Sequence, residues 1–153
     1  MRRMLFDEAY RRFWMDLGES RIMVLSTSLH DLVTSRMMSI VVLDGRLFFQ
    51  TDRTFRKYEQ IKGNAHVALC ADNFQIEGEC KEVGRPVENP DFCRAYEKYF
   101  HSSFQRYSGL ENERLFAVTP TFIERWRYVD GIPYMEMFEV EKRNYIWKKY
   151  NGE

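Results

Sequence analysis

Basic side chains gather where a predicted strand runs into a predicted helix, at residues 51–57. Arg53 precedes the helix, and Arg56 and Lys57 fall in its first turn, after Thr54 as the expected cap. The N-terminus of a helix carries partial positive charge, so these cations cost stability unless an anion lies among them. Free N–H groups with added Arg and Lys suit a phosphate group. We therefore expect a phosphate site at Thr51 to Lys57, and the alternative is a basic turn whose side chains extend into water.

Arg36 is a second cation at an unusual position, in the middle of the predicted strand Leu32 to Leu43. Side chains alternate between the two faces of a strand, which places Arg36 with Met38 on a mostly apolar face. A guanidinium group in such surroundings is costly unless it is paired. Arg36 therefore reaches solvent, pairs with a carboxylate, or points at the same anion as Arg56 and Lys57.

The periodicity of apolar residues predicts helices at intervals of three and four and strands where β-branched residues alternate. The predicted helices cover Phe6 to Leu17, Thr54 to Ile61 and Asp91 to Phe100, and residues 101–112 are expected to form a short helix or a loop. The predicted strands cover Arg21 to Ser28, Leu32 to Leu43, Arg46 to Thr51, Asn64 to Ala71, Asn73 to Gly84, Glu113 to Tyr128 and Ile132 to Val140. Tyr145 to Tyr150 is expected to be a tail that packs on the body through its rings.

The connections between these strands are short. Asp44-Gly45 and Asp130-Gly131 are hairpin signals, so consecutive strands are expected to pair antiparallel. Gly78 indicates a bend or a close approach within its strand, and a kink is expected at Pro120. About six or seven short strands interrupted by two or three helices indicate an antiparallel barrel or sandwich with helices attached.

The composition argues against several classes of protein. Lys+Arg and Asp+Glu both number 23, and a zero formal charge does not fit a general nucleic-acid binder. No run of about 18 apolar residues exists and no apolar signal core follows the basic N-terminus, so no membrane span is expected. The aromatic content of 16% suggests a large interface or a planar ligand.

The cysteines and histidines do not predict a metal site. Neither the three cysteines nor the three histidines have the sequence spacing of metal ligands. The cysteines are Cys70, Cys80 and Cys93, and the histidines are His30, His66 and His101. The odd number of cysteines is read as reduced thiols, so a cytoplasmic location and no metal are expected.

The order of these segments resembles the pyridoxamine 5′-phosphate oxidase-like family, the FMN-binding split β-barrels. The segments that carry the resemblance are Arg36-Met37-Met38-Ser39, Phe48-Phe49-Gln50-Thr51, Thr54-Phe55-Arg56-Lys57, Gly63 to Cys70 and Gly78 to Glu82. It covers roughly Arg21 to Arg85, and the rest of the chain is similar only in architecture. The resemblance implies a mainly β (α+β) fold: an antiparallel six- to seven-stranded split β-barrel with two to four flanking helices, as one domain over residues 1–153.

The resemblance further implies FMN at the interface of a homodimer. Basic side chains would hold the phosphate, and the strand ends would bond the isoalloxazine ring. Carried over to this chain, the cofactor-binding residues are Arg36, Arg56 and Lys57 for the phosphate, Thr51 or Thr54 as an assisting hydroxyl, and Met37, Met38, Ser39, Gln50, Gln75 and Trp126 around the flavin. Trp126 belongs to a segment that resembles the Glu-x-Trp of the family, and a place in the core is the alternative for it.

The resemblance does not extend to the substrate-binding segment of true pyridoxamine phosphate oxidases, which is of the Arg-x-His-x-Arg type. No such segment follows Trp126, where the tail reads Glu141-Lys142-Arg143-Asn144-Tyr145. The expected function is therefore an FMN-dependent oxidoreductase with another small-molecule substrate or an electron donor such as NAD(P)H, and no catalytic residue is assigned. The alternatives are a non-catalytic flavin or haem carrier or redox sensor, and a dimeric scaffold, which would leave the basic helix start uncompensated.

Overall fold

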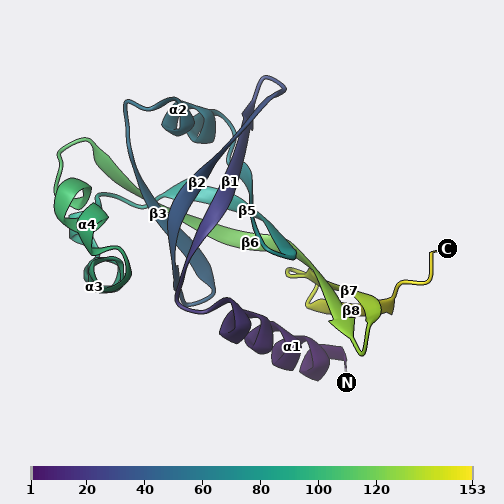
Figure 1. Ribbon diagram of the computed structural model, residues 1–153. Coiled ribbons are helices and arrows are strands. Elements are labelled where there is room, and N and C mark those ends of the chain that lie inside the picture. The colour runs from purple at the N-terminus through teal and green to yellow at the C-terminus, as the bar shows by residue number, and fades with distance from the viewer. Residues whose placement is uncertain (1, 153) are drawn as a thin grey trace.

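The computed structural model describes residues 2–152 and consists of one antiparallel sheet with helices around it (Figure 1). The strands are β1 (Ser20–Leu29), β2 (Leu32–Leu43), β3 (Arg46–Asp52), β4 (His66–Ala71), β5 (Phe74–Glu82), β6 (Glu113–Val129), β7 (Ile132–Glu139) and β8 (Asn144–Lys149). The helices are α1 (Arg2–Leu17), α2 (Arg56–Gly63), α3 (Pro90–Tyr99) and α4 (His101–Ser103), with a 3₁₀ turn η1 (Pro86–Glu88) and a π-helical turn η2 (Phe104–Ser108).

The sheet closes on itself into a barrel. Its strand order is β3-β2-β1-β4-β5-β6-β7-β8, and β3 also pairs with β6, so that β1 to β6 form a closed ring of six strands. This confirms the predicted antiparallel barrel and excludes the sandwich. β7 and β8 lie outside the ring, on an arm that projects with α1 at the lower right of Figure 1.

The C-terminal segment Tyr145 to Tyr150 differs from the prediction. It forms β8, which pairs with β7 from Asn144 opposite Glu139 to Lys149 opposite Tyr134. The tail is therefore largely a strand. Its aromatic residues are typical of strands, because aromatic rings pack well on a pleated surface.

The hairpins predicted at Asp44-Gly45 and Asp130-Gly131 are confirmed, and a third lies at His30-Asp31. Two-residue turns at His30-Asp31, Asp44-Gly45 and Asp130-Gly131 have both residues at positive φ, between 50° and 78°. Such turns match the right-handed twist of the strands that they join. The turns therefore fix β1–β2, β2–β3 and β6–β7 as antiparallel neighbours.

Gly78 lies where β5 and β6 approach closely. A Cβ atom there would lie 2.6 Å from Val118 and 2.7 Å from the carbonyl oxygen of Thr119. The register shifts at this point, because Gly78 faces Pro120 whereas Glu77 faces Phe122. The predicted kink at Pro120 is thus a bulge in a continuous strand, with Thr121 as the extra residue.

Two apolar clusters hold the barrel and its helices. The larger fills the ring and extends under α1, with fully buried side chains such as Phe49, Phe116 and Phe138. The smaller packs α3 onto the outer face of β2, β3 and β6 through Val41 and Phe92. α3 and α4 therefore cover one side of the barrel, on the left of Figure 1, whereas α2 lies over one end.

Three further features concern membrane-spanning helices, the cysteines and possible metal ligands. No helix in residues 2–152 is long and apolar enough to cross a membrane. Cys70, Cys80 and Cys93 are free thiols. Within the same residues, His, Cys, Asp and Glu side chains form no group of three or more that could hold a metal ion.

Candidate functional site

A pocket of about 380 Å³ lies where β2, β3 and the start of α2 meet α3 and η2. Six of the predicted cofactor-binding residues line it: Met37, Met38, Ser39, Gln50, Thr51 and Lys57. The other lining residues are Asp52, Phe55, Tyr96, Ser103, Tyr107, Leu110 and Glu113. Segments far apart in the sequence thus form one cavity of a size typical for small-molecule sites.

The pocket exists because β2 and β3 separate. They pair at only three positions, from Leu43 opposite Arg46 to Val41 opposite Phe48. Beyond Phe48, β3 continues along β6, whereas β2 continues along β1. Within residues 2–152, the edge of β2 before Val41 therefore has no partner strand on its β3 side. Its backbone groups at Met37 to Ser39 can bond a ligand instead.

Arg36 lies at the end of the barrel that α2 covers. Its guanidinium group donates to the carbonyl oxygen of Leu25 at 3.1 Å, Thr27 Oγ1 at 2.9 Å, Thr34 Oγ1 at 2.5 Å and Gln60 Oε1 at 3.3 Å. All four acceptors are neutral oxygens. Among the ion pairs of residues 2–152, none involves Arg36. Of the three alternatives for Arg36, pairing with a carboxylate is therefore wrong.

The three predicted phosphate ligands lie close enough to repel one another. Burial lowers the pKa of Arg36, and the charge of Arg56 lowers it further. Burial also lowers the pKa of Lys57, followed by the charge of Arg36, while Glu113 and Asp52 raise it. The structure thus brings Arg36 within electrostatic range of both Arg56 and Lys57, and of these three side chains Lys57 is the one that lines the pocket. An anion placed among these cations would reduce their repulsion.

α2 begins two residues later than predicted, and Thr54 is not its cap. The helix starts at Arg56, with Phe55 in the cap position and no side-chain capping bond. Thr54 is exposed, and both its hydroxyl and its backbone N–H donate to Asp52 Oδ1, at 2.6 Å and 2.8 Å. The carboxylate of Asp52 therefore organises the turn before the helix, and the first N–H groups of α2 keep no side-chain acceptor.

Gln75 and Trp126 lie apart from this pocket. Both line a second hollow of about 230 Å³ on β4, β5 and β6, together with Cys70 and Glu124. Gln75 Nε2 donates to Glu124 Oε2 at 3.4 Å, and Trp126 packs edge-on against the ring of Tyr150 at 5.5 Å. Trp126 belongs to neither apolar cluster, so the alternative of a core tryptophan is wrong.

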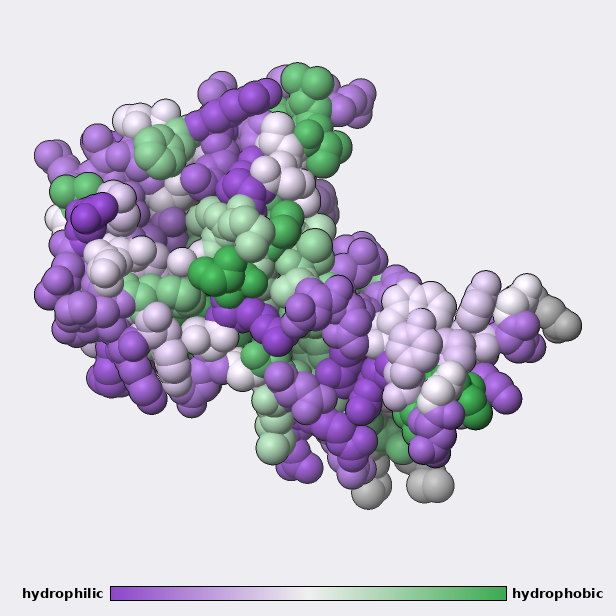
Figure 2. Space-filling view, viewed as in Figure 1, coloured by the Kyte–Doolittle hydropathy of each residue, from purple (hydrophilic) through white to green (hydrophobic). Residues whose placement is uncertain are grey.

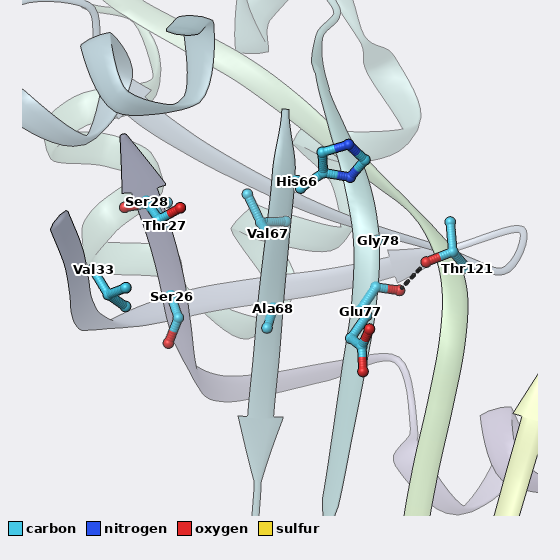
Figure 3. A pocket seen from close by; sticks show the side chains of 10 residues that line it. All are labelled: Ser26, Thr27, Ser28, Val33, His66, Val67, Ala68, Glu77, Gly78 and Thr121. Carbon is cyan, nitrogen blue, oxygen red and sulfur yellow. Dashed lines mark hydrogen bonds between the residues drawn. The ribbon is translucent and has the colours of Figure 1, made fainter. Parts of the chain in front are cut away.

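Another hollow, of about 270 Å³, lies on β1, β4 and β5 (Figure 3). Its walls carry small side chains such as Ser26 and Ala68 together with the acid Glu77, and His66 lies at one end. The hydroxyl of Thr121, the bulge residue, donates to the carbonyl oxygen of Glu77 here. No lysine or arginine lines this hollow. It therefore lacks the charge that an anionic ligand requires.

Sequence reasoning missed two residues of the site. Gln60 is buried on α2 and accepts bonds from Thr27, Thr34 and Arg36. A polar residue four positions after Arg56, on the apolar face of a helix, is a signal that could have identified it. Glu113 lines the pocket with only 6% of its surface exposed. No local pattern marks Glu113, because it reaches the pocket only through the pairing of β3 with β6.

Comparisons with known proteins agree with this geometry. A family model described as pyridoxamine 5′-phosphate oxidase matches residues 6–127. No curated protein sequence matches the chain. The fold is similar to that of PhzG from Burkholderia lata 383, solved in complex with tetrahydrophenazine-1-carboxylic acid, at 14% identity over 95% of this chain and 92% of that chain, with a TM-score of 0.62.

Two other solved structures illustrate the range of relatives with this fold. One is a pyridoxamine 5′-phosphate oxidase-related, FMN-binding protein from Nostoc punctiforme PCC 73102, at 12% identity over 95% of both chains and a TM-score of 0.59. The other is HutZ, the haem storage protein from Vibrio cholerae, at 15% identity over 78% of this chain and 91% of that chain, with a TM-score of 0.56. Since the family model spans most of the chain, the protein belongs to the pyridoxamine 5′-phosphate oxidase family.

Proposed function

We propose that the pocket between β2, β3 and α3 binds FMN, with the phosphate held by Arg36, Arg56 and Lys57. The observation that carries the proposal is the cluster of mutually repelling cations, in which Arg36 has only neutral partners. A phosphate group would supply the missing negative charge through charge-assisted hydrogen bonds. The N-terminus of α2, without a side-chain cap, adds free N–H donors on the same side.

The rest of the pocket suits a flavin ring. The unpaired edge of β2 at Met37 to Ser39 offers backbone donors and acceptors. Gln50 lines the same cavity, and its Oε1 accepts a hydrogen bond from Ser108 at 2.7 Å, so its amide N–H groups are the part that can bond a ligand. Thr51 Oγ1 is buried and has no hydrogen-bond partner among residues 2–152. Buried polar atoms nearly always have partners, so an orphaned hydroxyl in a pocket wall fits a site completed by a ligand.

The proposal includes a homodimer with the cofactor between the two copies. Ile22, Val33 and Met37 expose 45%, 70% and 64% of their surface on the outer side of β1 and β2. Figure 2 shows apolar residues gathered on this front face of the barrel, beside a concavity bounded by the β7–β8 arm. Such a patch is typical of a protein interface. A second copy here could bring its hollow at Gln75 and Trp126 to the open side of the pocket.

The activity proposed is that of an FMN-dependent oxidoreductase acting on a small molecule or on NAD(P)H. FMN supplies the hydride or electron chemistry when bound, and the chain binds it, orients it and excludes water. Beyond Trp126 the chain forms the β7–β8 hairpin and has no Arg-x-His-x-Arg segment. Pyridoxamine phosphate is therefore not the proposed substrate.

A non-catalytic carrier is the second candidate, and the pocket favours flavin over haem as its cargo. No histidine is among the residues that line the pocket. His66 lies instead in the outer hollow of Figure 3, and His30 in the β1–β2 turn. His101 is exposed on α4, two residues before Ser103 of the pocket wall, but it does not itself line the pocket. Histidine is the commonest protein ligand of haem iron, so a haem in this pocket would need another axial ligand.

The first test is the absorption spectrum of the purified protein and the identity of the cofactor that it releases. FMN is expected, and bleaching by NAD(P)H or a substrate followed by reoxidation would establish the enzyme. A haem band would support the haem carrier and contradict the proposal. A protein that neither holds FMN nor takes it up when it is added would also contradict the proposal.

The second test reverses the charges of the phosphate ligands. Arg56→Glu with Lys57→Glu is expected to weaken FMN binding on the order of 100-fold, because two charge-assisted contacts become repulsive. The control is Arg11→Glu with Lys149→Glu, which makes the same change in net charge at exposed positions on α1 and β8. Equal FMN affinity in the two double variants would show that the phosphate assignment is wrong.

A further inference from the structure

Glu113 is a buried carboxylic acid in the wall of the pocket. It is the first residue of β6 and lies opposite Asp52 in the β3–β6 ladder. Only 6% of its surface is exposed, yet its side chain lines the cavity beside Lys57. Fully buried Glu side chains are rare unless they are paired, so this position calls for a physical explanation.

The groups around Glu113 leave its charge poorly compensated. Asp52 on β3 repels it, Lys57 on α2 attracts it, and the phenols of Tyr96 on α3 and Tyr107 on η2 line the same cavity. The adjacent Arg114 donates to the carbonyl oxygens of Glu111 and Glu113 rather than to the carboxylate. No hydrogen bond to the carboxylate of Glu113 is present among residues 2–152. Burial, and then the charge of Asp52, raise the pKa of Glu113 to about 7, while Lys57 lowers it.

We propose that Glu113 is the acid–base residue of this pocket, which takes up a proton when an anionic ligand binds among Arg36, Arg56 and Lys57. This inference rests on the proposed anion site. A phosphate beside Lys57 competes with Glu113 for the cation that stabilises its carboxylate, and the phosphate adds negative charge of its own. Both effects favour the neutral acid. The protonated carboxyl can then donate a hydrogen bond to a ligand atom in the cavity.

The sign of the pH dependence follows from linkage. If the bound state holds one more proton than the free state, affinity falls as pH rises through the pKa of the free protein. One unit of difference between bound and free pKa corresponds to a tenfold change in affinity. Since free Glu113 titrates near pH 7, the loss is expected between about pH 6.5 and 8.5.

The experiment measures FMN affinity by quenching of flavin fluorescence across this range, in the wild type and in Glu113→Gln. The ligand phosphate ionises near pH 6, but this affects both proteins alike. The wild type is expected to lose about tenfold more affinity than Glu113→Gln as the pH rises. The control Glu111→Gln changes an exposed acid two residues away and should behave as the wild type. A difference below twofold between the wild type and Glu113→Gln would overturn the proposal.

A second measurement separates this inference from the function proposed above. The carboxyl carbon of Glu113 in the wild type is followed by ¹³C NMR against pH, with and without inorganic phosphate. A midpoint near 7 that rises when phosphate is added supports the proton coupling, whether or not FMN binds. A midpoint near that of a free Glu, or one that phosphate does not move, contradicts it. Failure of FMN to bind at any pH would overturn the proposed function alone.

Discussion

Arg36 and Arg125 are both arginines on barrel strands, but their surroundings are opposite. Arg125 is 7% exposed and has two carboxylate partners: its Nε donates to Glu136 at 2.7 Å, and its NH1 donates to Asp16 at 2.9 Å. Arg36 is partly buried and has only hydroxyl, amide and carbonyl oxygens around it. The charge of Arg125 is balanced by neighbouring carboxylates, whereas Arg36 has only neutral hydrogen-bond partners.

The difference separates structural charge from functional charge. Arg125 and Glu136 join α1, β6 and β7 in a closed network, to which Tyr145 on β8 adds a 2.6 Å bond to Glu136. A network with its charges paired holds elements together and has little to offer a ligand. A cation whose partners are all neutral keeps an unbalanced positive charge, which attracts an anion placed nearby. The same residue type therefore has different roles, and the charge of its partners distinguishes them.

The largest effect is expected from breaking the closed network. Glu136→Leu leaves Arg125 with the partly exposed Asp16 alone and removes the acceptor of the Tyr145 hydroxyl. Arg125 NH2 is already buried without a hydrogen-bond partner in the described part of the chain, so the network has no spare acceptor there. We expect the free energy of unfolding, measured with urea, to fall by about 3–5 kcal/mol.

A matched variant on the same strand provides the control. Glu139→Leu removes a carboxylate that is 30% exposed, pairs with Lys142 at 3.2 Å and accepts a hydrogen bond from Asn144 Nδ2 at 2.9 Å. It is expected to lower the free energy of unfolding by about 1 kcal/mol, because an exposed ion pair and one neutral hydrogen bond contribute little. Equal stabilities of the two variants would show that the Arg125 network is not structural.

The next largest effect is expected on binding rather than on stability. Arg36→Met should lower FMN affinity about 10- to 100-fold through loss of one charge-assisted contact. The free energy of unfolding should change by less than about 1 kcal/mol, because Thr27 and Thr34 still donate to Gln60 at 2.7 Å and 2.8 Å. Urea unfolding and flavin fluorescence measure the two quantities on one preparation.

Arg46→Met is the control for that variant. Arg46 is exposed at the far end of the β2–β3 hairpin and stacks over Phe48, 5.1 Å from its ring. The Arg46→Met substitution should therefore leave FMN affinity unchanged. A large loss of stability in Arg36→Met without any loss of affinity would place Arg36 with Arg125 as a structural cation.

Local patterns were enough to predict most of the barrel. Alternation identified the strands, and the turns at Asp44-Gly45 and Asp130-Gly131 fixed two of the hairpins. The pairing of β3 with β6 was not predictable in this way, because it joins residues about 65 positions apart and depends on the closure of the whole sheet. β8 was missed since its aromatic residues were read as packing from a tail rather than from a strand.

The residues of the candidate site also fall into those that local sequence patterns identified and those that depend on long-range pairing. The cations were identifiable from sequence because Arg36, Arg56 and Lys57 are locally out of place in a strand and at a helix start. Glu113 was not, because its burial beside Asp52 is created by long-range pairing. Thr54 was misread as a cap because Asp52 takes its hydroxyl and its N–H before α2 begins. Sequence shows a charge in an unusual place, but the partner of each polar group is known only once the chain is folded.

The contrast between satisfied and unsatisfied polar groups also distinguishes the two threonines proposed to assist the phosphate. Thr51 Oγ1 is buried without a partner, whereas Thr54 Oγ1 already donates to Asp52 at 2.6 Å. Thr51→Val removes an orphaned hydroxyl, so stability should hold or rise slightly, while FMN affinity falls three- to tenfold, or about 1 kcal/mol. Thr54→Val should lose a little stability through the weaker turn at Asp52 and leave affinity unchanged. The reverse pattern in flavin titrations would move the phosphate contact to Thr54, and with it the anion to the exposed side of the basic turn.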